Sequence, residues 1–364
     1  MPQQPALSDA RRPDAESRVM TELETLIRRD PGRRGLCSTD AENPLCPGHL
    51  AEAALHLAEE ADDVAIVTGF WVARGTPAAC ETDGPLGALF LASVFKSLGI
   101  RVRLMTDAPG MRALSAGMRA VGLPREMLVE FPGISTPADN QPSTGNGQAD
   151  VEGWLREFYG HGPGSELTHL VAIERVGPSH TVASLGQQTR PTEVPLGDFL
   201  KAAPAEHHDH YHNMLGHVIT EHHAPIHRLF EFVVEQDLPI RTIGIGDGGN
   251  EIGMGRIAWE EIHRRISGGR GGLVACRVPA HHNVIAGTSN WGGYALAAAV
   301  LWCRGQVDLL RPLDRDRELD LLETLVEEGP LVDGVTGRQE PTVDGLPFET
   351  YIQALEGIRH IMLR

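Results

Sequence analysis

The sequence predicts an α/β fold: a mostly parallel β-sheet with helices on both faces, in a Rossmann-like layered sandwich. Two observations support this prediction. Short, almost continuous apolar runs, such as residues 64–67, are typical of strands that are buried on both faces of a parallel sheet. These runs alternate with longer segments whose apolar residues follow helical spacing, which is the pattern of repeated β–α units. The 364 residues show no internal repeat, and we expect a single domain over residues 1–364.

In the first half of the chain, strands and helices are predicted to alternate. Apolar residues at helical spacing predict a first helix over 16–29. Pro85 suits the first turn of a helix within the segment 81–99, after a short loop. The segment 132–149 is rich in Pro, Ser, Thr, Gly and Asn, so we expect a flexible surface loop there. The other predictions are helices over 50–61 and 110–121 and strands over 64–67, 101–107 and 127–131.

The second half is predicted to continue this alternation. The segment 178–208 shows no regular pattern, and we expect an irregular insertion there. The predicted strands lie at 169–175, 241–249 (a strand and its loop) and 272–278. The predicted helices lie at 150–159, 225–236, 250–266, 291–305, 315–328 and 349–362, with a loop at 329–347.

The composition excludes several classes of function. Lys and Arg number 32 against 49 Asp and Glu, and the formal net charge of −17 argues against binding to nucleic acids or to anionic membranes. No apolar stretch approaches the about 18 residues of a membrane span. The five cysteines form no C-x-x-C motif, and the N-terminus lacks the apolar core of a signal peptide. We therefore expect a cytoplasmic protein that binds a small anionic substrate and is able to form homo-oligomers.

Polar residues follow several predicted strands. Parallel sheets place their sites beyond the carboxyl ends of the strands, so these residues are the first candidates for a site. A single charged pair at such a position is commonly a structural ion pair, and Asp83 would equally serve as a helix cap. The shared location at strand ends favours a functional site. The candidate strings are Thr68-Gly69-Phe70, Thr106-Asp107, Glu174-Arg175 and residues 246–251.

Residues 244–249 match the pattern G-x-G-x-x-G between a predicted strand and a predicted helix. In dinucleotide-binding proteins the amides of this loop hold a pyrophosphate, so an NAD(P)-dependent oxidoreductase is one interpretation. Asp247 lies inside the loop, however, and its charge would repel a phosphate. Two other interpretations stay open: glycines that only allow a tight turn, and a site in which Asp247, Asn250 and Glu251 carry the chemistry.

Eight of the 17 histidines lie between residues 207 and 227. His208 and His212 have the i, i+4 spacing of helical metal ligands. The sequence contains no H-E-x-x-H motif, and the segment looks irregular, so we expect a solvent-exposed, histidine-rich loop. The motifs of P-loop NTPases and of α/β-hydrolases are also absent from the sequence.

Along nearly its whole length, the sequence resembles the D-glutamate cyclase family. The matching strings are Arg34-Gly35-Leu36, Asn43-Pro44-Leu45, 47–50, 68–70, 81–85, 169–175, 246–251, 253–255, 285–287, 289–296 and 343–348. The chain departs from the family pattern at an insert of roughly thirty residues before Tyr211-His212-Asn213, a length that surface loops tolerate. Two further departures are Met214-Leu215-Gly216, which replaces basic residues of the family, and Arg256, which stands where the family commonly has a lysine.

The resemblance implies a hydro-lyase that closes D-glutamate reversibly to 5-oxo-D-proline with loss of water. The substrate amine must lose a proton before it attacks the γ-carboxyl carbon. A carboxylate would act as general base, and a carboxyl group with a raised pKa as general acid. The candidate catalytic residues are Asp247, Glu251, Glu174 and Asp83.

Other groups would bind the substrate. Backbone or side-chain amides would stabilise the oxyanion, and a guanidinium or the amino end of a helix would bind the α-carboxylate. The candidate substrate-binding residues are Arg175, Asn213, Gly248, Gly249, Asn250, Ser289 and Asn290.

The acids also resemble a site for a hard metal ion. Mg²⁺ or Mn²⁺ would be held by one or two carboxylates and water, and no other cofactor is expected. The candidate ligands are Asp83, Asp107, Asp247 and Glu251. A further alternative is a non-catalytic relative that binds a small molecule, to which the changes at 211–216 would point.

Overall fold

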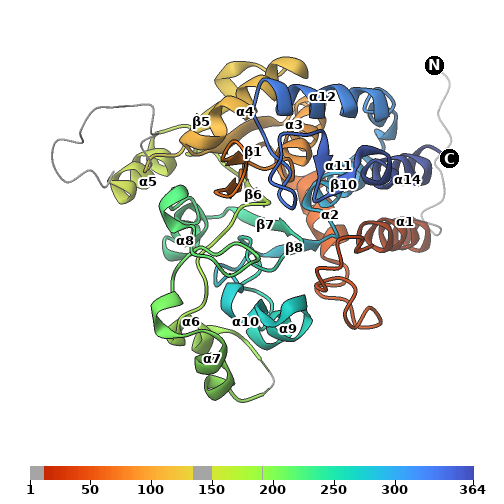
Figure 1. The fold of residues 1–364 in the computed structure, drawn as a ribbon. Helices are drawn as coiled ribbons and strands as arrows, with labels where there is room; N and C mark the ends of the chain where they lie inside the picture. Colours follow the sequence, from red (N-terminus) through yellow and green to blue (C-terminus); the bar gives the residue numbers. More distant parts are fainter. Residues whose placement is uncertain (1–11, 134–149, 191) are drawn as a thin grey trace, which may run out of the picture.

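A parallel β-sheet forms the centre of the molecule, and helices cover both of its faces (Figure 1). The computed structural model describes residues 12–133, 150–190 and 192–364. All pairings within the central sheet are parallel, which confirms the predicted α/β fold. Its six strands are β1 (Asp63–Thr68), β4 (Arg101–Thr106), β5 (Leu128–Glu130), β6 (His169–Ile173), β7 (Arg241–Gly246) and β8 (His282–Ile285).

The strand order is β5-β4-β1-β6-β7-β8. From β1 the chain proceeds through β4 to β5 at one edge of the sheet. It then returns to β6, which pairs with the other side of β1, and continues to β8 at the opposite edge. The strand order therefore reverses between β1 and β6, and such a switch point opens a crevice beyond the carboxyl ends of the two strands.

Alternate side chains of each strand enter two different hydrophobic cores. In β1, Val64 and Ile66 pack on one face of the sheet, and Ala65 and Val67 pack on the other. Both sets are fully buried, which explains why the strands are nearly continuous apolar runs. The first core is covered by α1 (Arg12–Ile27), α2 (His49–Glu60), α3 (Pro85–Ser97), α4 (Ala108–Ala120), α11 (Ser289–Cys303), α12 (Arg315–Glu327), α13 (Phe348–Tyr351) and α14 (Gln353–Leu363). The second is covered by α5 (Val151–Gly160), α6 (Val182–Gln187), α7 (Leu196–Ala202), α8 (Arg228–Glu235), α9 (Trp259–Arg265) and α10 (Gly271–Val274).

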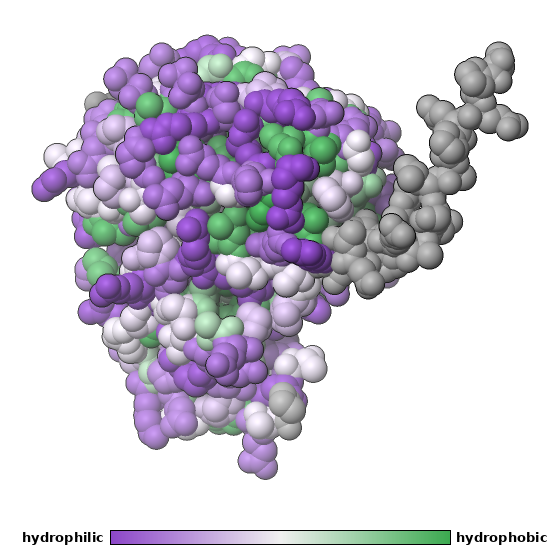
Figure 2. Space-filling view, turned by 90° about the vertical axis from the view of Figure 1, so that its right-hand side faces the viewer, coloured by the Kyte–Doolittle hydropathy of each residue, from purple (hydrophilic) through white to green (hydrophobic). Residues whose placement is uncertain are grey.

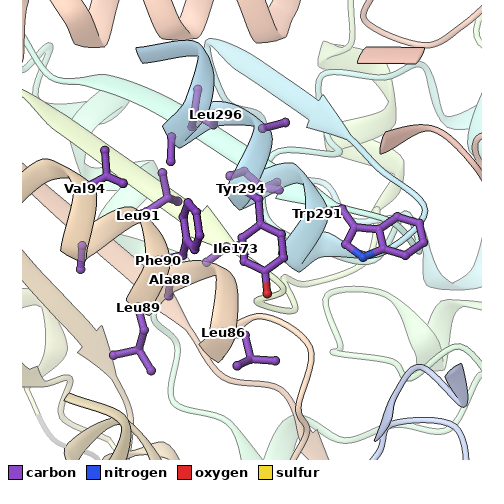
Figure 3. Close-up of a cluster of buried hydrophobic side chains, with 14 of the residues drawn as sticks. Leu86, Ala88, Leu89, Phe90, Leu91, Val94, Ile173, Trp291, Tyr294 and Leu296 are labelled. Atoms are coloured by element: carbon purple, nitrogen blue, oxygen red, sulfur yellow. The ribbon is translucent and has the colours of Figure 1, made fainter. Parts of the chain in front are cut away.

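Helices α3 and α11 pack closely on the first face and bring their amino ends together. Phe90 and Tyr294 face each other between the two helices, with ring centroids 4.8 Å apart (Figure 3). The backbones approach at glycines: a Cβ on Gly293 would lie 3.1 Å from the Cα of Gly87, and a Cβ on Gly87 would lie 2.9 Å from the Cα of Asn290. This approach fixes the start of α11 beside the loop that precedes α3.

Two predicted elements of the second half are wrong. Residues 272–278, predicted as a strand, begin within the short helix α10, and the amide of Cys276 bonds to the carbonyl of Gly249 in a loop. The sixth strand is β8, which the sequence did not indicate. The helix predicted over 250–266 starts only at Trp259. A short apolar run looks the same in a strand and in a buried turn, and the residues before α9 form turns against other loops.

Several predicted loops contain small elements. The segment 178–208 includes α6 and α7, and most of 132–149 lies outside the described residues. The loop predicted over 329–347 contains a hairpin of β9 (Thr342–Val343) and β10 (Leu346–Pro347). Its turn is Asp344-Gly345, and both residues have positive φ (56° and 74°), as a tight hairpin turn requires. A second hairpin, β2 (Trp71–Val72) and β3 (Ala79–Cys80), follows β1.

The prediction of a solvent-exposed histidine loop is wrong for three of its members, His212, His223 and His227, which are buried. The ring of His223 accepts a hydrogen bond from the amide of Trp71 at 3.0 Å, and the ring of His227 bonds to the Tyr211 hydroxyl at 2.6 Å. Burial lowers the pKa of both His223 and His227 to about 3, so both rings are neutral. Through these hydrogen bonds, the two rings link neighbouring loops. Within the described residues, the groups of side chains that could hold a metal ion consist of carboxylates and contain no histidine.

The surface is mostly hydrophilic on the face that carries α1 and α14, where hydrophobic residues form separate patches (Figure 2). None of the described helices combines the length and the apolar character that a membrane crossing requires. Self-association stays a prediction.

A buried carboxyl group supports α11 from the side of α12. Glu318 accepts a hydrogen bond from the hydroxyl of Tyr294, which also bonds to the hydroxyl of Tyr351. Burial raises the pKa of Glu318 from 4.5 to about 7. Between these two pH values the folded protein keeps a proton that the unfolded chain releases, so deprotonation favours unfolding.

We expect Glu318 to make the protein less stable as the pH rises from 4.5 to about 7. The loss should reach about 3 kcal/mol of unfolding free energy, because each pKa unit of difference is worth about 1.4 kcal/mol. Denaturant unfolding at about pH 4 and about pH 8 measures it in the wild type and in Glu318→Gln. The free energy of unfolding of Glu318→Gln should lack this part of the pH dependence. The same pH dependence in the wild type and in the variant would contradict the role given to Glu318.

Candidate active site

A cluster of buried carboxylates lies at the switch point of the sheet. Its members come from the loop before α3, the end of β6, the loop after β7 and the β9–β10 turn. Gly84 in the first of these loops lies directly against the ends of β1 and β6: a Cβ there would be 2.6 Å from Thr68 Oγ1 and 2.8 Å from the Cβ of Glu174. Within the described residues, this acid cluster consists of Glu81, Asp83, Glu174, Asp247, Glu251 and Asp344.

Asp247 is at the centre of the acid cluster. Carboxylate oxygens of Asp83, Asp247 and Asp344 lie within 4.8 Å of one another, and the same is true of Glu174, Asp247 and Glu251. The four acids that the sequence indicated as catalytic therefore lie together. Asp344 received no role from the sequence, although it falls in a string that carries the family resemblance.

Arg34 is the cation of this cluster, and its guanidinium forms ion pairs with Asp247 and Asp344. Asp30 holds the turn that carries it, because the Asp30 carboxylate accepts the amides of Arg34 and Gly35 at 3.0 and 2.8 Å. Burial acts against the charge of Arg34, but the two aspartates outweigh it and hold its pKa well above the usual value. Arg34 had no predicted role, because its partners lie 213 and 310 positions away in the chain.

Burial and crowding together raise the pKa values of most carboxyl groups in the cluster. For each affected group burial is the largest cause, and the negative charge of neighbouring acids adds to it. A carboxyl group with a raised pKa holds its proton closer to neutral pH, so the cluster contains groups that donate and accept protons. The groups whose pKa lies well above the ordinary range are Glu81, Asp83, Glu174 and Asp247.

Glu251 organises the loop that follows β7. Its carboxylate accepts hydrogen bonds from the amides of Asp247, Gly248 and Gly249. The amides of Gly248 and Gly249, which we expected to face an oxyanion, are therefore already bonded to a side chain. The same bonds leave these amides unavailable to a pyrophosphate, and the surrounding acids would repel one. The G-x-G-x-x-G loop is thus unsuited to a dinucleotide.

Asp83 occupies the amino end of α11. Its carboxylate accepts the amides of Ser289 at 2.9 Å, Asn290 at 2.8 Å and Gly84 at 3.0 Å. The Asn290 side chain accepts the amides of Gly84 and Gly87, both at 2.8 Å. The structure thus places Ser289 and Asn290 in contact with the acid cluster, but the helix end that we expected to bind the substrate carboxylate already holds Asp83.

Glu174, like Asp344, combines a place in the acid cluster with an unusual backbone conformation. Its φ is 44°, in the left-handed region that non-glycine residues rarely adopt. Its carboxylate accepts a hydrogen bond from the hydroxyl of Ser289. Such strained residues persist where the surroundings hold them firmly, and they concentrate at functional sites. From the end of β6, its carboxylate lies with an oxygen within 4.8 Å of an oxygen of Asp247.

Arg175 and Asp107 form a separate, buried ion pair. The guanidinium of Arg175 also donates to the carbonyls of Gly69 at 2.7 Å and Ala224 at 3.2 Å. Burial acts to raise the pKa of Asp107, but Arg175 reverses this and lowers it. The structure therefore does not bring Asp107 into the acid cluster, and the Arg175 charge has a partner within the protein.

A cavity of about 220 Å³ opens beside the acid cluster. Arg34, Glu81 and Glu174 line it together with Asn213. Its volume is below the about 300 Å³ at which drug-sized pockets begin, so it suits a small metabolite. Larger cavities of about 520 and 900 Å³ lie along α1 and beside α8, but no member of the acid cluster lines either of them.

The two predicted asparagines hold neighbouring loops in place. The side chain of Asn213 accepts the amides of Leu215 and His217, both at 3.0 Å. The side chain of Asn250 donates to the carbonyl of His212 at 2.8 Å. Asn213 thereby fixes a loop at the cavity wall, and Asn250 joins this loop to the one after β7.

Comparison with known proteins agrees with the resemblance seen in the sequence. The family model described as "D-glutamate cyclase-like, C-terminal" matches residues 23–193 and 198–359, which together contain Arg34 and the whole acid cluster. The chain is 32% identical over 352 residues to the human protein named "D-glutamate cyclase, mitochondrial". This match covers 91% of the chain and 50% of the human protein, so the chain spans about half the length of this relative. On both grounds, the chain belongs to the family described as D-glutamate cyclase-like, C-terminal.

Proposed function

We propose that this protein catalyses the reversible closure of D-glutamate to 5-oxo-D-proline with loss of water, as a hydro-lyase. The observation that carries the proposal is the acid cluster with raised pKa values beside a cavity of metabolite size. The human relative is named for this type of reaction. Its name also places that protein in mitochondria, and a cytoplasmic location for this chain stays a prediction.

The reaction requires groups that pass protons in both directions. The ammonium group of the substrate loses two protons when its nitrogen becomes the lactam nitrogen. The γ-carboxylate oxygen that departs gains two protons and leaves as water. A carboxyl group whose pKa approaches the working pH performs both transfers well, since it accepts and donates at similar cost.

Glu174 is the group best placed for these transfers. It lines the cavity, its pKa is raised by burial and by Glu251, and Ser289 fixes its carboxylate. A carboxylate oxygen of Asp247 lies within 4.8 Å of the Glu174 carboxylate, so without a bound metal ion Asp247 is placed to take up the second proton. Because amine and carboxyl belong to one molecule, holding the substrate in its folded conformation supplies much of the remaining rate enhancement.

The acid cluster also fits a divalent cation. The Oδ2 atoms of Asp247 and Asp344 are buried and have no hydrogen-bond partner in the described structure. Carboxylate oxygens are the ligands that Mg²⁺ and Mn²⁺ prefer, and Asp83 lies within reach of both aspartates. We propose that Asp83, Asp247 and Asp344 hold one such ion, which would polarise the reacting carboxyl group. Asp107 lies outside this set, because it is paired with Arg175.

The first test is turnover by Glu174→Gln, with chiral chromatography following D-glutamate and 5-oxo-D-proline in both directions. The wild type should interconvert them, and the variant should lose about a hundredfold or more of kcat, because general acid–base groups contribute factors of this size. Its melting temperature should not fall. Asp308→Asn, at an exposed acid paired with Arg311, is the control with unchanged activity. Absence of turnover by the wild type, with and without divalent metal, would refute the proposed function.

The pH dependence of the rate tests the electrostatic role of Arg34. Its charge lowers the pKa of Asp247 and of Glu174, so Arg34→Gln should move the pH–rate profile to higher pH, by about one unit. The rate profile of kcat/KM would be recorded for this variant and for Arg33→Gln, which changes the exposed neighbouring residue. A profile that keeps its position in Arg34→Gln would show that Arg34 does not set these pKa values.

Metal dependence is tested by titration calorimetry with Mn²⁺ and Mg²⁺ on chelator-treated protein, together with turnover. We expect binding of one ion and a weaker affinity in Asp344→Asn, by about tenfold or more, because a ligand oxygen is lost. Asp107→Asn should leave ion binding unchanged. Full activity after chelation, with no heat of binding, would remove the metal from the proposal.

A further inference from the structure

The substrate and product of the proposed reaction share one group that does not react, the α-carboxylate. The inference below rests on the proposed function and concerns how this group is bound. A carboxylate that enters a pocket lined by acids needs a cation or free backbone amides, because the acids would otherwise repel it.

Three candidates for this role already have partners within the protein. Arg175 is buried in its ion pair with Asp107. The amino end of α11 holds Asp83. The guanidinium of Arg34 lies between Asp247 and Asp344. The charge of each of these guanidinium groups is therefore already balanced by carboxylates of the protein, and the amides at the start of α11 already bind one.

Arg74 is the other cation that lines the cavity. It lies in the loop between β2 and β3, and it is exposed. Its Nη2 donates to the carbonyls of Gly334 at 3.0 Å and Val335 at 2.8 Å. Within the described residues it has no carboxylate partner, in contrast to Arg34 and Arg175.

The contacts of Arg74 hold its guanidinium in a defined position across the cavity. The turn that carries Gly334 and Val335 is itself fixed, because the Asp333 carboxylate accepts the amides of Val335 and Thr336 at 2.8 and 2.7 Å. A guanidinium has five N–H donors, and two are used by the carbonyls. Nε and Nη1 therefore keep their N–H groups for a ligand, and the side chain loses little further freedom on binding it.

The cavity changes character from its exposed side to its buried side. Leu215 and Val335 are 39% and 48% exposed, whereas Glu81 and Glu174 are only 6% and 5% exposed, and all four line the same cavity. Arg74 thus stands at the exposed end with apolar side chains, and the acids stand at the buried end. This polarity matches a ligand with an anionic end and an amine.

We propose that Arg74 binds the α-carboxylate of the substrate at the mouth of the cavity. The apolar wall formed by Trp71, Met214 and Leu215 then contacts the methylene carbons, and the amine and the reacting γ-carboxyl face Glu174. Arg74 is a positioning and specificity residue: it selects small molecules that carry a carboxylate at this end and takes no part in proton transfer.

The test is titration calorimetry with two ligands, 5-oxo-D-proline and its uncharged carboxamide. The wild type should prefer the acid. Arg74→Gln should bind the acid about tenfold or more weakly, the size expected for a hydrogen bond to a charged group, and should bind the amide unchanged. Arg74→Lys keeps the charge but lacks the paired N–H donors of the guanidinium, so its affinity for the acid should lie between those of the wild type and Arg74→Gln. Arg112→Gln is the matched control, because Arg112 is exposed and donates to the carbonyl of Glu328 at 2.8 Å.

The outcomes separate this inference from the proposed function. Turnover by the wild type together with an unchanged preference for the acid in Arg74→Gln would overturn the role of Arg74 alone. A wild type that binds neither ligand and converts neither substrate would overturn the proposed function and this inference with it. In turnover assays, Arg74→Gln should raise KM for D-glutamate by a larger factor than it lowers kcat. An equal loss of kcat/KM in Arg74→Gln and in Arg112→Gln would contradict a specific role of Arg74.

Discussion

The ion pairs of Arg34 with Asp247 and Asp344 are the contacts on which the site depends. They join three segments that are far apart in the sequence: the turn after α1, the loop after β7 and the β9–β10 hairpin. Several carboxylates packed into a buried volume repel one another and lose their hydration. One buried guanidinium, held in place by Asp30, offsets part of this cost. Protons retained at raised pKa values reduce this cost further, and they leave the cluster able to donate and accept protons.

The surrounding fold is arranged to hold these unfavourable groups in place. The hydrophobic cores on both faces of the sheet fix β1, β6 and β7, and the glycine contacts between α3 and α11 bring Asp83 to the helix end that stabilises it. Glu174 keeps a left-handed backbone at the end of β6. A protein that stores strain and buried charge at one location gives up stability for function there. The stability comes from the cores, and the chemistry comes from the strand ends.

Much of this arrangement could be predicted from the sequence, and the remainder depends on contacts over long distances in the chain. The parallel sheet followed from apolar runs, and the position of Glu174 and Asp247 followed from the rule that sites lie beyond strand ends. The role of Arg34 did not follow, because the local pattern of residues 30–49 contains only turn signals. The strand predicted at 272–278 failed because a short apolar run does not reveal its hydrogen-bond partners. The burial of His223 and His227 was not predicted, because the segment around them has the composition of a polar loop and does not reveal which groups its histidines contact.

The loop after β7 shows how one local sequence pattern serves different chemistry in different surroundings. Its glycines allow the tight turn after the strand that a phosphate-binding loop also needs. Here Glu251, four residues after Asp247, supplies the negative charge that accepts the loop amides. A carboxylate from within the chain thus takes the place that a phosphate would occupy. Once the amides are satisfied in this way, further anions are repelled from the loop, and added protons or cations are favoured. The loop therefore contributes to a proton-transfer site, and the α-carboxylate, which does not react, must be bound elsewhere, at the exposed end of the cavity where Arg74 lies.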